Sequence, residues 1–211
     1  MKKILIYGDS NVWGDNFFTG IRLKDEYQWP RILQKKIGSD YEIIQEGLPG
    51  RLAGADEVVK TYKNGRDSFM SIFRTASPVD IVIIALGTND LQLKYQKSGS
   101  KIVDDLVWYK DNLKEQMMDE DDRKKYFVNG KLPRIIYLLP PKFDYNGGAS
   151  GIFNKDSEEI RKSLLHLLKE KIDDEIIDLD ELPLVEDGIH LSIEGHKILA
   201  NKVEELLGYG K

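Results

Sequence analysis

The sequence predicts an α/β fold in which a five-stranded parallel sheet is covered by helices on both faces. Five short runs are rich in β-branched residues and apolar at nearly consecutive positions, as in strands buried on both sides. Helical patterns alternate with these runs, and this alternation indicates parallel strands joined by right-handed crossovers. The chain has 211 residues, so we expect residues 1–211 to form a single domain.

The individual elements follow from these patterns in chain order. The strands are expected at residues 3–7, 41–45, 81–86, 134–139 and 175–179. The helices are expected at residues 29–37, near 55–63, and at 102–118, 157–172 and 193–207. A block of charged residues at 119–125 is interpreted as a solvated helix end or excursion.

Composition and charge exclude several functional classes. With 31 Lys and Arg against 36 Asp and Glu, the net charge is −5, which argues against a protein that binds nucleic-acid phosphates. Cysteine is absent, so disulfides, thiol catalysis and cysteine-ligated zinc or iron–sulfur sites are excluded. No segment approaches the ~20 apolar residues of a membrane span. The apolar start stops at Gly8 without a small-residue cleavage site, and we therefore expect a cytoplasmic protein.

Polar residues follow each predicted strand, and ligands bind at the carboxyl ends of the strands in open parallel sheets. The segments concerned are residues 8–11, 46–51, 87–90, 140–143 and 187–190. All five fall at one edge of the sheet, which makes this edge the expected site.

The side chains at this edge suit nucleophilic acyl transfer. Ser10 lies at a strand-to-helix turn, and a serine hydroxyl needs an adjacent base to become a nucleophile. His190 can be that base, and Asp187 can orient its imidazole ring. The oxyanion then needs donors, and the candidates are the backbone N–H groups of Ser10 and Gly50 and the side-chain amide of Asn89.

The other two histidines have the periodicity of structural residues. His166 shares a helix face with charged residues, so we expect it at the surface. His196 lies at helical spacing from Leu199, Ala200 and Val203, which predicts a packed position in the last helix. That helix should begin at Ser192 as its N-cap. A cationic imidazole is disfavoured near a helix N-terminus, so His196 is expected to be neutral.

Four blocks of the sequence resemble the SGNH (GDSL-type) hydrolases. They are Gly-Asp-Ser-Asn at 8–11, the glycine at 50, Gly-Thr-Asn-Asp at 87–90 and Asp-Gly-Ile-His at 187–190, in the family's order and spacing. Within the family, the chain is similar to the intracellular arylesterase/acyltransferase-like branch at residues 8–14, 28–30, 46–51, 85–91 and 187–196. It departs from the pattern at Glu46, where an asparagine is common, and at about 112–131, which looks like an excursion specific to the branch.

The resemblance implies a flavodoxin-like three-layer α/β/α sandwich with strand order 2-1-3-4-5. It also implies that Ser10 is the nucleophile, that Gly50 and Asn89 belong to the oxyanion hole, and that Asp187 pairs with His190. We therefore expect an esterase that acts on a small-molecule ester through an acyl-enzyme, without a metal or other cofactor. Trp13, Arg51, Lys142 and Phe143 are candidate substrate-binding residues.

Several alternatives stay open at this stage. The acyl donor could be an acetylated sugar, a short aliphatic ester, a thioester or a lysophospholipid, and an alcohol could replace water in an acyltransferase. A second hypothesis is a metal-dependent phosphoester hydrolase that uses Asp9, Asp90, Asp187 and His190. A third is a non-catalytic flavodoxin-like binding module, although Asp9 in the first loop would repel a phosphate. The sequence also leaves homo-oligomer formation open.

Overall fold

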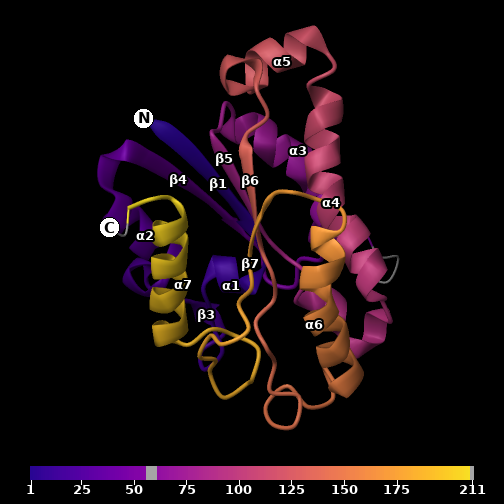
Figure 1. Ribbon diagram of the computed structural model, residues 1–211. Coiled ribbons are helices and arrows are strands. Elements are labelled where there is room, and N and C mark those ends of the chain that lie inside the picture. Colours follow the sequence, from indigo (N-terminus) through magenta and orange to yellow (C-terminus); the bar gives the residue numbers. More distant parts are fainter. Residues whose placement is uncertain (56–60, 210–211) are drawn as a thin grey trace.

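A computed structural model describes residues 1–55 and 61–209, and its centre is one parallel sheet (Figure 1). The strands of this sheet are β1 (Lys2–Gly8), β4 (Tyr41–Gly47), β5 (Ile81–Ala85), β6 (Arg134–Leu138) and β7 (Glu175–Ile177). Their order is β4-β1-β5-β6-β7. Counted as the five predicted strands this is 2-1-3-4-5, so both the strands and their order are confirmed.

Seven α-helices are present in the described residues, together with a small antiparallel pair, β2 (Asp15–Asn16) with β3 (Ile21–Arg22). The helices are α1 (Ser10–Trp13), α2 (Trp29–Ile37), α3 (Gly65–Ala76), α4 (Gly99–Gln116), α5 (Glu120–Tyr126), α6 (Lys155–Lys169) and α7 (Ile193–Leu206). Short 3₁₀ helices lie at Asp25–Tyr27, Gly38–Asp40, Thr61–Lys63, Asn89–Leu91, Leu93–Tyr95 and Val128–Gly130.

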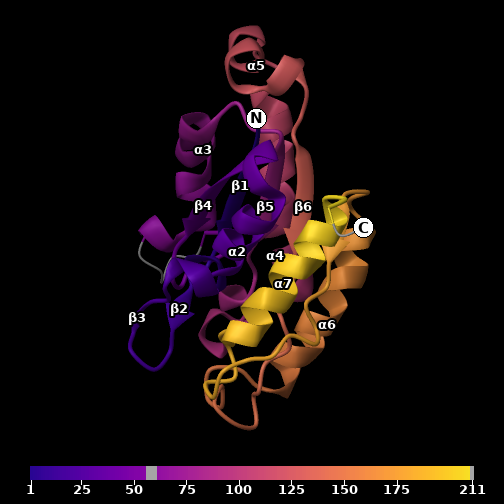
Figure 2. The same ribbon diagram turned by 90° about the vertical axis from the view of Figure 1, so that its left-hand side faces the viewer.

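The alternation of side chains along the strands divides the core into two layers. On β1, Leu5 and Tyr7 pack with α3, α4 and α6, whereas Ile4 and Ile6 pack with α2 and α7. Successive strand residues point to opposite faces, so a run that is apolar at every position needs helices on both sides. Figures 1 and 2 show α2 and α7 on one face of the sheet, with α3, α4 and α6 on the other.

The helix predictions were confirmed in four cases and incomplete elsewhere. Helix α2 has the predicted bounds, and α4, α6 and α7 differ from the prediction by a few residues at their ends. Helix α3 was not predicted, because its buried face has only the narrow stripe of Phe69, Phe73 and Ala76. Of the helix expected near 55–63, residues 56–60 lie outside the described part and 61–63 form a 3₁₀ helix.

The charge block at 119–125 forms a helix of its own, α5, rather than the end of another helix. Asp119 caps it by accepting a hydrogen bond from the Asp122 N–H at 2.8 Å. Acidic side chains fill the first turn and basic ones the last, which complements the helix dipole. Figure 1 shows α5 at the top of the molecule, well above α1, which lies near the middle. The excursion at 112–131 is therefore remote from the expected site.

The two structural histidines lie where the sequence predicts. His166 is exposed and faces Glu170. His196 is buried in α7, behind its N-cap Ser192, and its Nδ1 accepts a hydrogen bond from the Trp29 N–H at 3.3 Å. Burial, together with the nearby His190, lowers the pKa of His196 to about 4. His196 is therefore neutral at pH 7, as predicted.

No helix in the described residues is long and apolar enough to cross a membrane.

We predict that His196 lowers the free energy of unfolding of the protein in mild acid. The unfolded chain binds a proton at His196 near pH 6.5, whereas the folded chain binds it only near pH 4. Protons therefore favour the unfolded state as the pH falls through this window, and by pH 4 the loss is on the order of 3 kcal/mol. Urea denaturation of wild type and His196→Asn at pH 7, 6, 5 and 4 measures this loss as the difference between the unfolding free energies of the two proteins. A stability difference between the two proteins that does not change with pH would contradict the prediction.

Candidate active site

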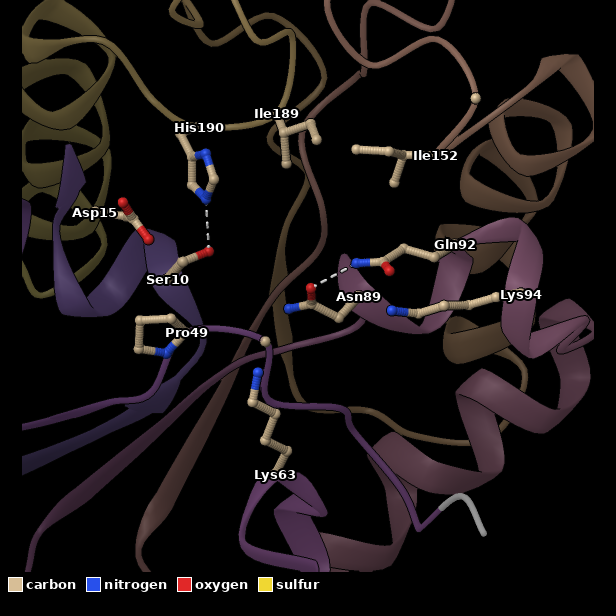
Figure 3. Close-up of a pocket in the computed structure, with 12 residues that line it drawn as sticks. Ser10, Asp15, Pro49, Lys63, Asn89, Gln92, Lys94, Ile152, Ile189 and His190 are labelled. Carbon is tan, nitrogen blue, oxygen red and sulfur yellow. Dashed lines mark hydrogen bonds between the residues drawn. The ribbon is translucent and has the colours of Figure 1, made fainter. Parts of the chain in front are cut away.

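Ser10, His190 and Asp187 form a continuous hydrogen-bonded chain at the carboxyl edge of the sheet. His190 Nε2 lies 3.0 Å from Ser10 Oγ, and His190 Nδ1 lies 2.5 Å from Asp187 Oδ2. Figure 3 shows the imidazole above the Ser10 hydroxyl at one side of a pocket. The structure thus brings together the three residues that the sequence selected, although 177 residues separate Ser10 from Asp187 in the chain.

The loop that carries Asp187 and His190 is folded back on itself by a glycine. Gly188 has φ = +67°, a left-handed conformation that a residue without Cβ adopts at little cost. Asp187 Oδ1 then accepts hydrogen bonds from the backbone N–H groups of Ile189 and His190 at 2.9 and 3.0 Å. One carboxylate oxygen therefore shapes the turn while the other holds the imidazole.

Asn11 connects this loop to the helix that carries Ser10. Its Oδ1 accepts a hydrogen bond from the Leu191 N–H at 2.9 Å, and its Nδ2 donates to the Ile189 carbonyl at 3.5 Å. On the other side of Ser10, the Asp9 carboxylate caps α1 by accepting from the Asn11 N–H. The sequence motif contained Asn11, but its role as a clamp became visible only in the structure.

The pKa shifts of His190 and Asp187 suit a histidine base that is paired with an ionised carboxylate. Burial alone lowers the pKa of His190, but its hydrogen bond to Asp187 and the charges of Asp187, Asp15 and Asp9 raise it above the usual value. Burial alone raises the pKa of Asp187, but the hydrogen bonds from His190 and Ile189 lower it below the usual value. Asp187 therefore stays ionised and stabilises a protonated imidazole.

Burial raises the pKa of Asp9 to about 6, although the Asn11 hydrogen bond and the nearby His190 act in the opposite direction. Asp9 is fully buried behind Ser10. It serves the helix cap rather than the pocket.

Three residues that line the pocket, Ser10, Gly50 and Asn89, carry candidate hydrogen-bond donors. The backbone N–H groups of Ser10 and Gly50 donate to no acceptor within residues 1–55 and 61–209. Gly50 has φ = +77°, which favours glycine there. The third donor is the side chain of Asn89, which lines the same pocket.

The amide of Asn89 is oriented by two hydrogen bonds. Gln92 Nε2 donates to Asn89 Oδ1 at 2.9 Å (Figure 3), and Asn89 Nδ2 donates to the Arg51 carbonyl at 3.1 Å. These contacts fix which end of the amide is the donor, and they leave the second N–H of Nδ2 for the pocket. Gln92 was not selected from the sequence, although it lies only three residues after Asn89.

A buried ionic network supports the loops around Asn89 and Gly50. Lys97 Nζ lies 2.7 Å from Asp90 Oδ1 and 3.1 Å from Asp105 Oδ2, and both carboxylates are fully buried. The other oxygen of Asp90 accepts a hydrogen bond from the Ala53 N–H at 2.8 Å. Burial alone lowers the pKa of Lys97, but the charges of Asp90 and Asp105 raise it, so Lys97 stays charged. The network ties the turn after β5 to the loop after β4.

The pocket beside Ser10 has a volume of about 460 Å³. Its lining residues come from five loops: Ser10, Asp15, Pro49, Gly50, Lys63, Asn89, Gln92, Lys94, Gly151, Ile152, Ile189 and His190. Ile152 belongs to a loop without a recognisable motif, and neither Lys63 nor Lys94 has a local pattern that marks it. Sequence reasoning had no signal for these three residues.

The four candidate substrate-binding residues are not among the residues that line this pocket. Arg51 is buried, donates to the carbonyls of Gly8 and Glu46, and stacks on the Tyr7 ring. It holds the loop that carries Gly50 against the end of β1.

Lys142, Phe143 and Trp13 are also placed elsewhere. Phe143 is buried against Phe153, with ring centroids 4.2 Å apart, and Lys142 borders a separate hollow with it. Trp13 packs beneath the guanidinium of Arg22. None of the three lines the pocket that contains Ser10, although Lys142 and Phe143 lie in the loop after β6 and Trp13 is the last residue of α1.

The carboxylates invoked for a phosphoesterase are engaged separately. Asp9 caps α1, Asp90 binds Lys97, and Asp187 binds His190. Among the residues that the structure describes, no group of three His, Cys, Asp or Glu side chains is arranged to hold a metal ion. The geometry therefore offers this alternative no ligand set in the described residues.

Comparison with protein families gives one match over most of the chain. The family described as GDSL-like Lipase/Acylhydrolase matches residues 4–203. A comparison with curated proteins gave no match.

Solved structures with the same fold are numerous. Est24, a carbohydrate acetylesterase from Sinorhizobium meliloti, is 24% identical with a TM-score of 0.83, and 99% of each chain is covered. A putative arylesterase from Agrobacterium tumefaciens str. C58 is 22% identical with a TM-score of 0.80 and 99% coverage of each chain. The native aryl esterase of M. Smegmatis is 23% identical with a TM-score of 0.78, covering 98% of this chain and 100% of that one. At these identities the likeness shows the fold.

We predict that Lys97→Met strongly destabilises the protein. The substitution leaves the carboxylates of Asp90 and Asp105 buried with fewer partners, and breaking a buried ion pair costs about 3–5 kcal/mol. Lys101→Met is the matched control, because Lys101 also contacts Asp105 but its side chain is 52% exposed. This control should cost less than about 1 kcal/mol. Urea denaturation measures both, and equal stability of the two variants would contradict a buried role for Lys97.

Proposed function

Because the chain belongs to the GDSL-like lipase/acylhydrolase family and is a serine esterase, we propose that it hydrolyses carboxylic esters through an acyl-enzyme on Ser10. The observation that carries this proposal is the relay from Ser10 Oγ through His190 to Asp187, at 3.0 and 2.5 Å. A serine next to a base, with the base oriented by a third group, is the arrangement that nucleophilic catalysis requires.

In the first half of the reaction, His190 Nε2 takes the proton of Ser10 as Oγ bonds to the ester carbonyl carbon. The tetrahedral intermediate carries a negative oxygen, and His190 is then an imidazolium stabilised by Asp187. When the bond between carbon and the leaving oxygen breaks, the imidazolium gives its proton to that oxygen. The alcohol departs and the acyl group remains on Ser10.

In the second half, water repeats the same steps. His190 Nε2 takes a proton from the water as its oxygen bonds to the acyl carbon. Collapse of the second tetrahedral intermediate releases the carboxylic acid and returns the proton to Ser10 Oγ. An alcohol in place of water would give acyl transfer, with the same proton movements.

The negative oxygen of both intermediates is stabilised by the Ser10 and Gly50 N–H groups and by Asn89 Nδ2. The two backbone N–H groups donate to no acceptor in the described residues, and donors that are held in place beforehand need little reorganisation when charge develops. Gln92 and the Arg51 carbonyl hold the Asn89 amide in the orientation that this role requires.

The pocket favours a small acyl group. Its volume of about 460 Å³ is within the usual range for small-molecule sites, and Ile152 and Ile189 are the large apolar side chains in its lining. A carbohydrate acetylesterase and aryl esterases share the fold. We therefore propose esters with short acyl chains as substrates in preference to lysophospholipids.

We predict that His190 is the general base and His196 is not. His190→Ala should lower kcat by roughly 10⁴-fold or more, close to the loss in Ser10→Ala, because the three residues act as a unit. His196→Ala should retain most of the activity and lose about 1–2 kcal/mol of stability. Hydrolysis of p-nitrophenyl acetate and thermal melting measure both effects.

In the same experiment, mass spectrometry of acid-quenched wild type should find one acetyl group on the peptide that contains Ser10. If His196→Ala folds normally but is as inactive as Ser10→Ala while His190→Ala remains active, the assignment is wrong. Hydrolysis should also persist in EDTA; activity lost on chelation and restored by a divalent ion would favour the phosphoesterase-type site.

We predict that Asn89→Ala slows turnover more than it weakens substrate binding. Asn89 is proposed to donate to an oxygen that becomes negative only in the transition state, so its loss should lower kcat by about 10²–10³-fold with a smaller change in KM. Gln92→Ala should give a weaker effect of the same kind, because it frees the Asn89 amide without removing it. Steady-state kinetics with p-nitrophenyl acetate provide the measurement, and a normal kcat in Asn89→Ala would remove Asn89 from the proposed oxyanion hole.

A further inference from the structure

Two lysines, Lys63 and Lys94, line the catalytic pocket beside Asn89 and Gln92 (Figure 3). Neither ammonium group forms an ion pair with a carboxylate in residues 1–55 and 61–209, although Lys94 lies over the ring of Tyr95 at 4.7 Å. The chain as a whole carries a net charge of −5. A pocket with two cations that have no carboxylate partner in the part of the chain that the structure describes thus differs from the negative charge of the protein as a whole.

The position of Lys63 is set by the packing of the loop that carries Gly50. The Lys63 carbonyl accepts a hydrogen bond from the Leu52 N–H at 2.9 Å. Its Nζ lies 2.7 Å from the point where a Cβ on residue 50 would stand. The absence of a side chain at Gly50 thus makes room for the Lys63 ammonium at the pocket wall.

Lys94 reaches the pocket from the short 3₁₀ helix Leu93–Tyr95. The Leu93 N–H donates to the Ile152 carbonyl at 3.0 Å, which attaches this helix to the loop on the far side of the pocket. Lys97, in contrast, forms ion pairs with Asp90 and Asp105.

The negative and positive side chains of the pocket lie on opposite sides of it. Figure 3 shows Asp15 next to Ser10 and His190, whereas Lys63 and Lys94 lie around Asn89, away from the imidazole. The charge of Asp15 contributes to the raised pKa of His190, which places this carboxylate on the His190 side. A bound anion would be attracted to the Asn89 side and repelled from the His190 side.

The chemistry of the proposed reaction relates these two sides to the two parts of an ester. The leaving oxygen must come within hydrogen-bond reach of His190 Nε2, which protonates it. The alcohol part then occupies the side of His190 and Asp15. The carbonyl oxygen points to the proposed oxyanion donors, and the acyl chain leaves the carbonyl carbon on the side away from His190, where Lys63 and Lys94 line the pocket.

We propose that the preferred substrate carries an anionic group on its acyl part, bound by Lys63 and Lys94. A monoester of a dicarboxylic acid is the simplest compound of this class. This inference rests on the proposed esterase function, and it names the substrate class of the same site.

The test compares two esters whose acyl chains differ only at the end, a methyl group in p-nitrophenyl hexanoate and a carboxylate in the mono-p-nitrophenyl ester of adipic acid. Wild type should hydrolyse the anionic ester with a kcat/KM about tenfold higher, the size expected for two partly exposed ion pairs. The preference should shrink as sodium chloride is added, because salt screens exposed charges.

The double variant Lys63→Gln/Lys94→Gln should lose this preference while its kcat/KM for p-nitrophenyl hexanoate stays within about threefold of wild type. Lys202→Gln is the matched control, since it removes one positive charge from an exposed position late in α7. It should keep the full preference.

The proposal is overturned if wild type treats the two esters alike, or if the double variant keeps the preference. It is also overturned if the charge matters only on the alcohol part, which a comparison of 4-acetoxybenzoate with its methyl ester would reveal. Failure of the esterase function itself gives a different result, namely no hydrolysis of p-nitrophenyl acetate or of either hexanoate-length ester.

Discussion

The parallel register of β1 between β4 and β5 is the constraint on which the site depends. Gly8 at the end of β1 lies opposite Gly47 of β4 and Ala85 of β5. The three strands therefore end at one level, and the loops that follow them begin side by side. A Cβ on Gly8 would lie 2.2 Å from the Val12 side chain and 2.7 Å from the Ala85 carbonyl, so the close approach of α1 to the sheet requires glycine there.

From this common level, each loop is held to its neighbour by a small number of polar contacts. Arg51 donates to the Gly8 carbonyl and links the loop after β4 to β1. Asp90 reaches the Ala53 N–H and links the turn after β5 to the same loop. Asn11 links α1 to the loop before α7. Because these contacts join different strands and helices, displacement of one loop would disturb the geometry of the others.

Buried charge has two distinct uses in this molecule. Away from the pocket, Lys97 is surrounded by carboxylates, and the resulting network stabilises loop positions without contacting the pocket volume. At the pocket, Asp187 is the hydrogen-bond partner of His190, whose imidazole changes its protonation state in the proposed reaction. The first arrangement needs charges that stay constant, and the second needs a histidine whose pKa is shifted by an anion that stays ionised.

Much of the fold and the central relay could be predicted from the sequence, because both depend on short-range patterns. Apolar runs of strand length defined all five strands, and the order of polar motifs after them selected Ser10, Asp187 and His190 before their distances were known. The helical periodicity of residues 196–203 likewise separated His196 from His190. The strand order came from the family resemblance rather than from these patterns.

Only the tertiary structure decided which side chains face the pocket. Arg51 and Phe143 lie in loops that the sequence indicated and Trp13 lies in α1, but each packs against a group outside the pocket, namely the Tyr7 ring, the Phe153 ring and the Arg22 guanidinium. Lys63 and Lys94 carry no local pattern, and they reach the site through loop contacts with Leu52 and Ile152. Strand position follows from periodicity within a few residues, whereas the direction of a loop side chain is determined by long-range contacts that no local pattern encodes.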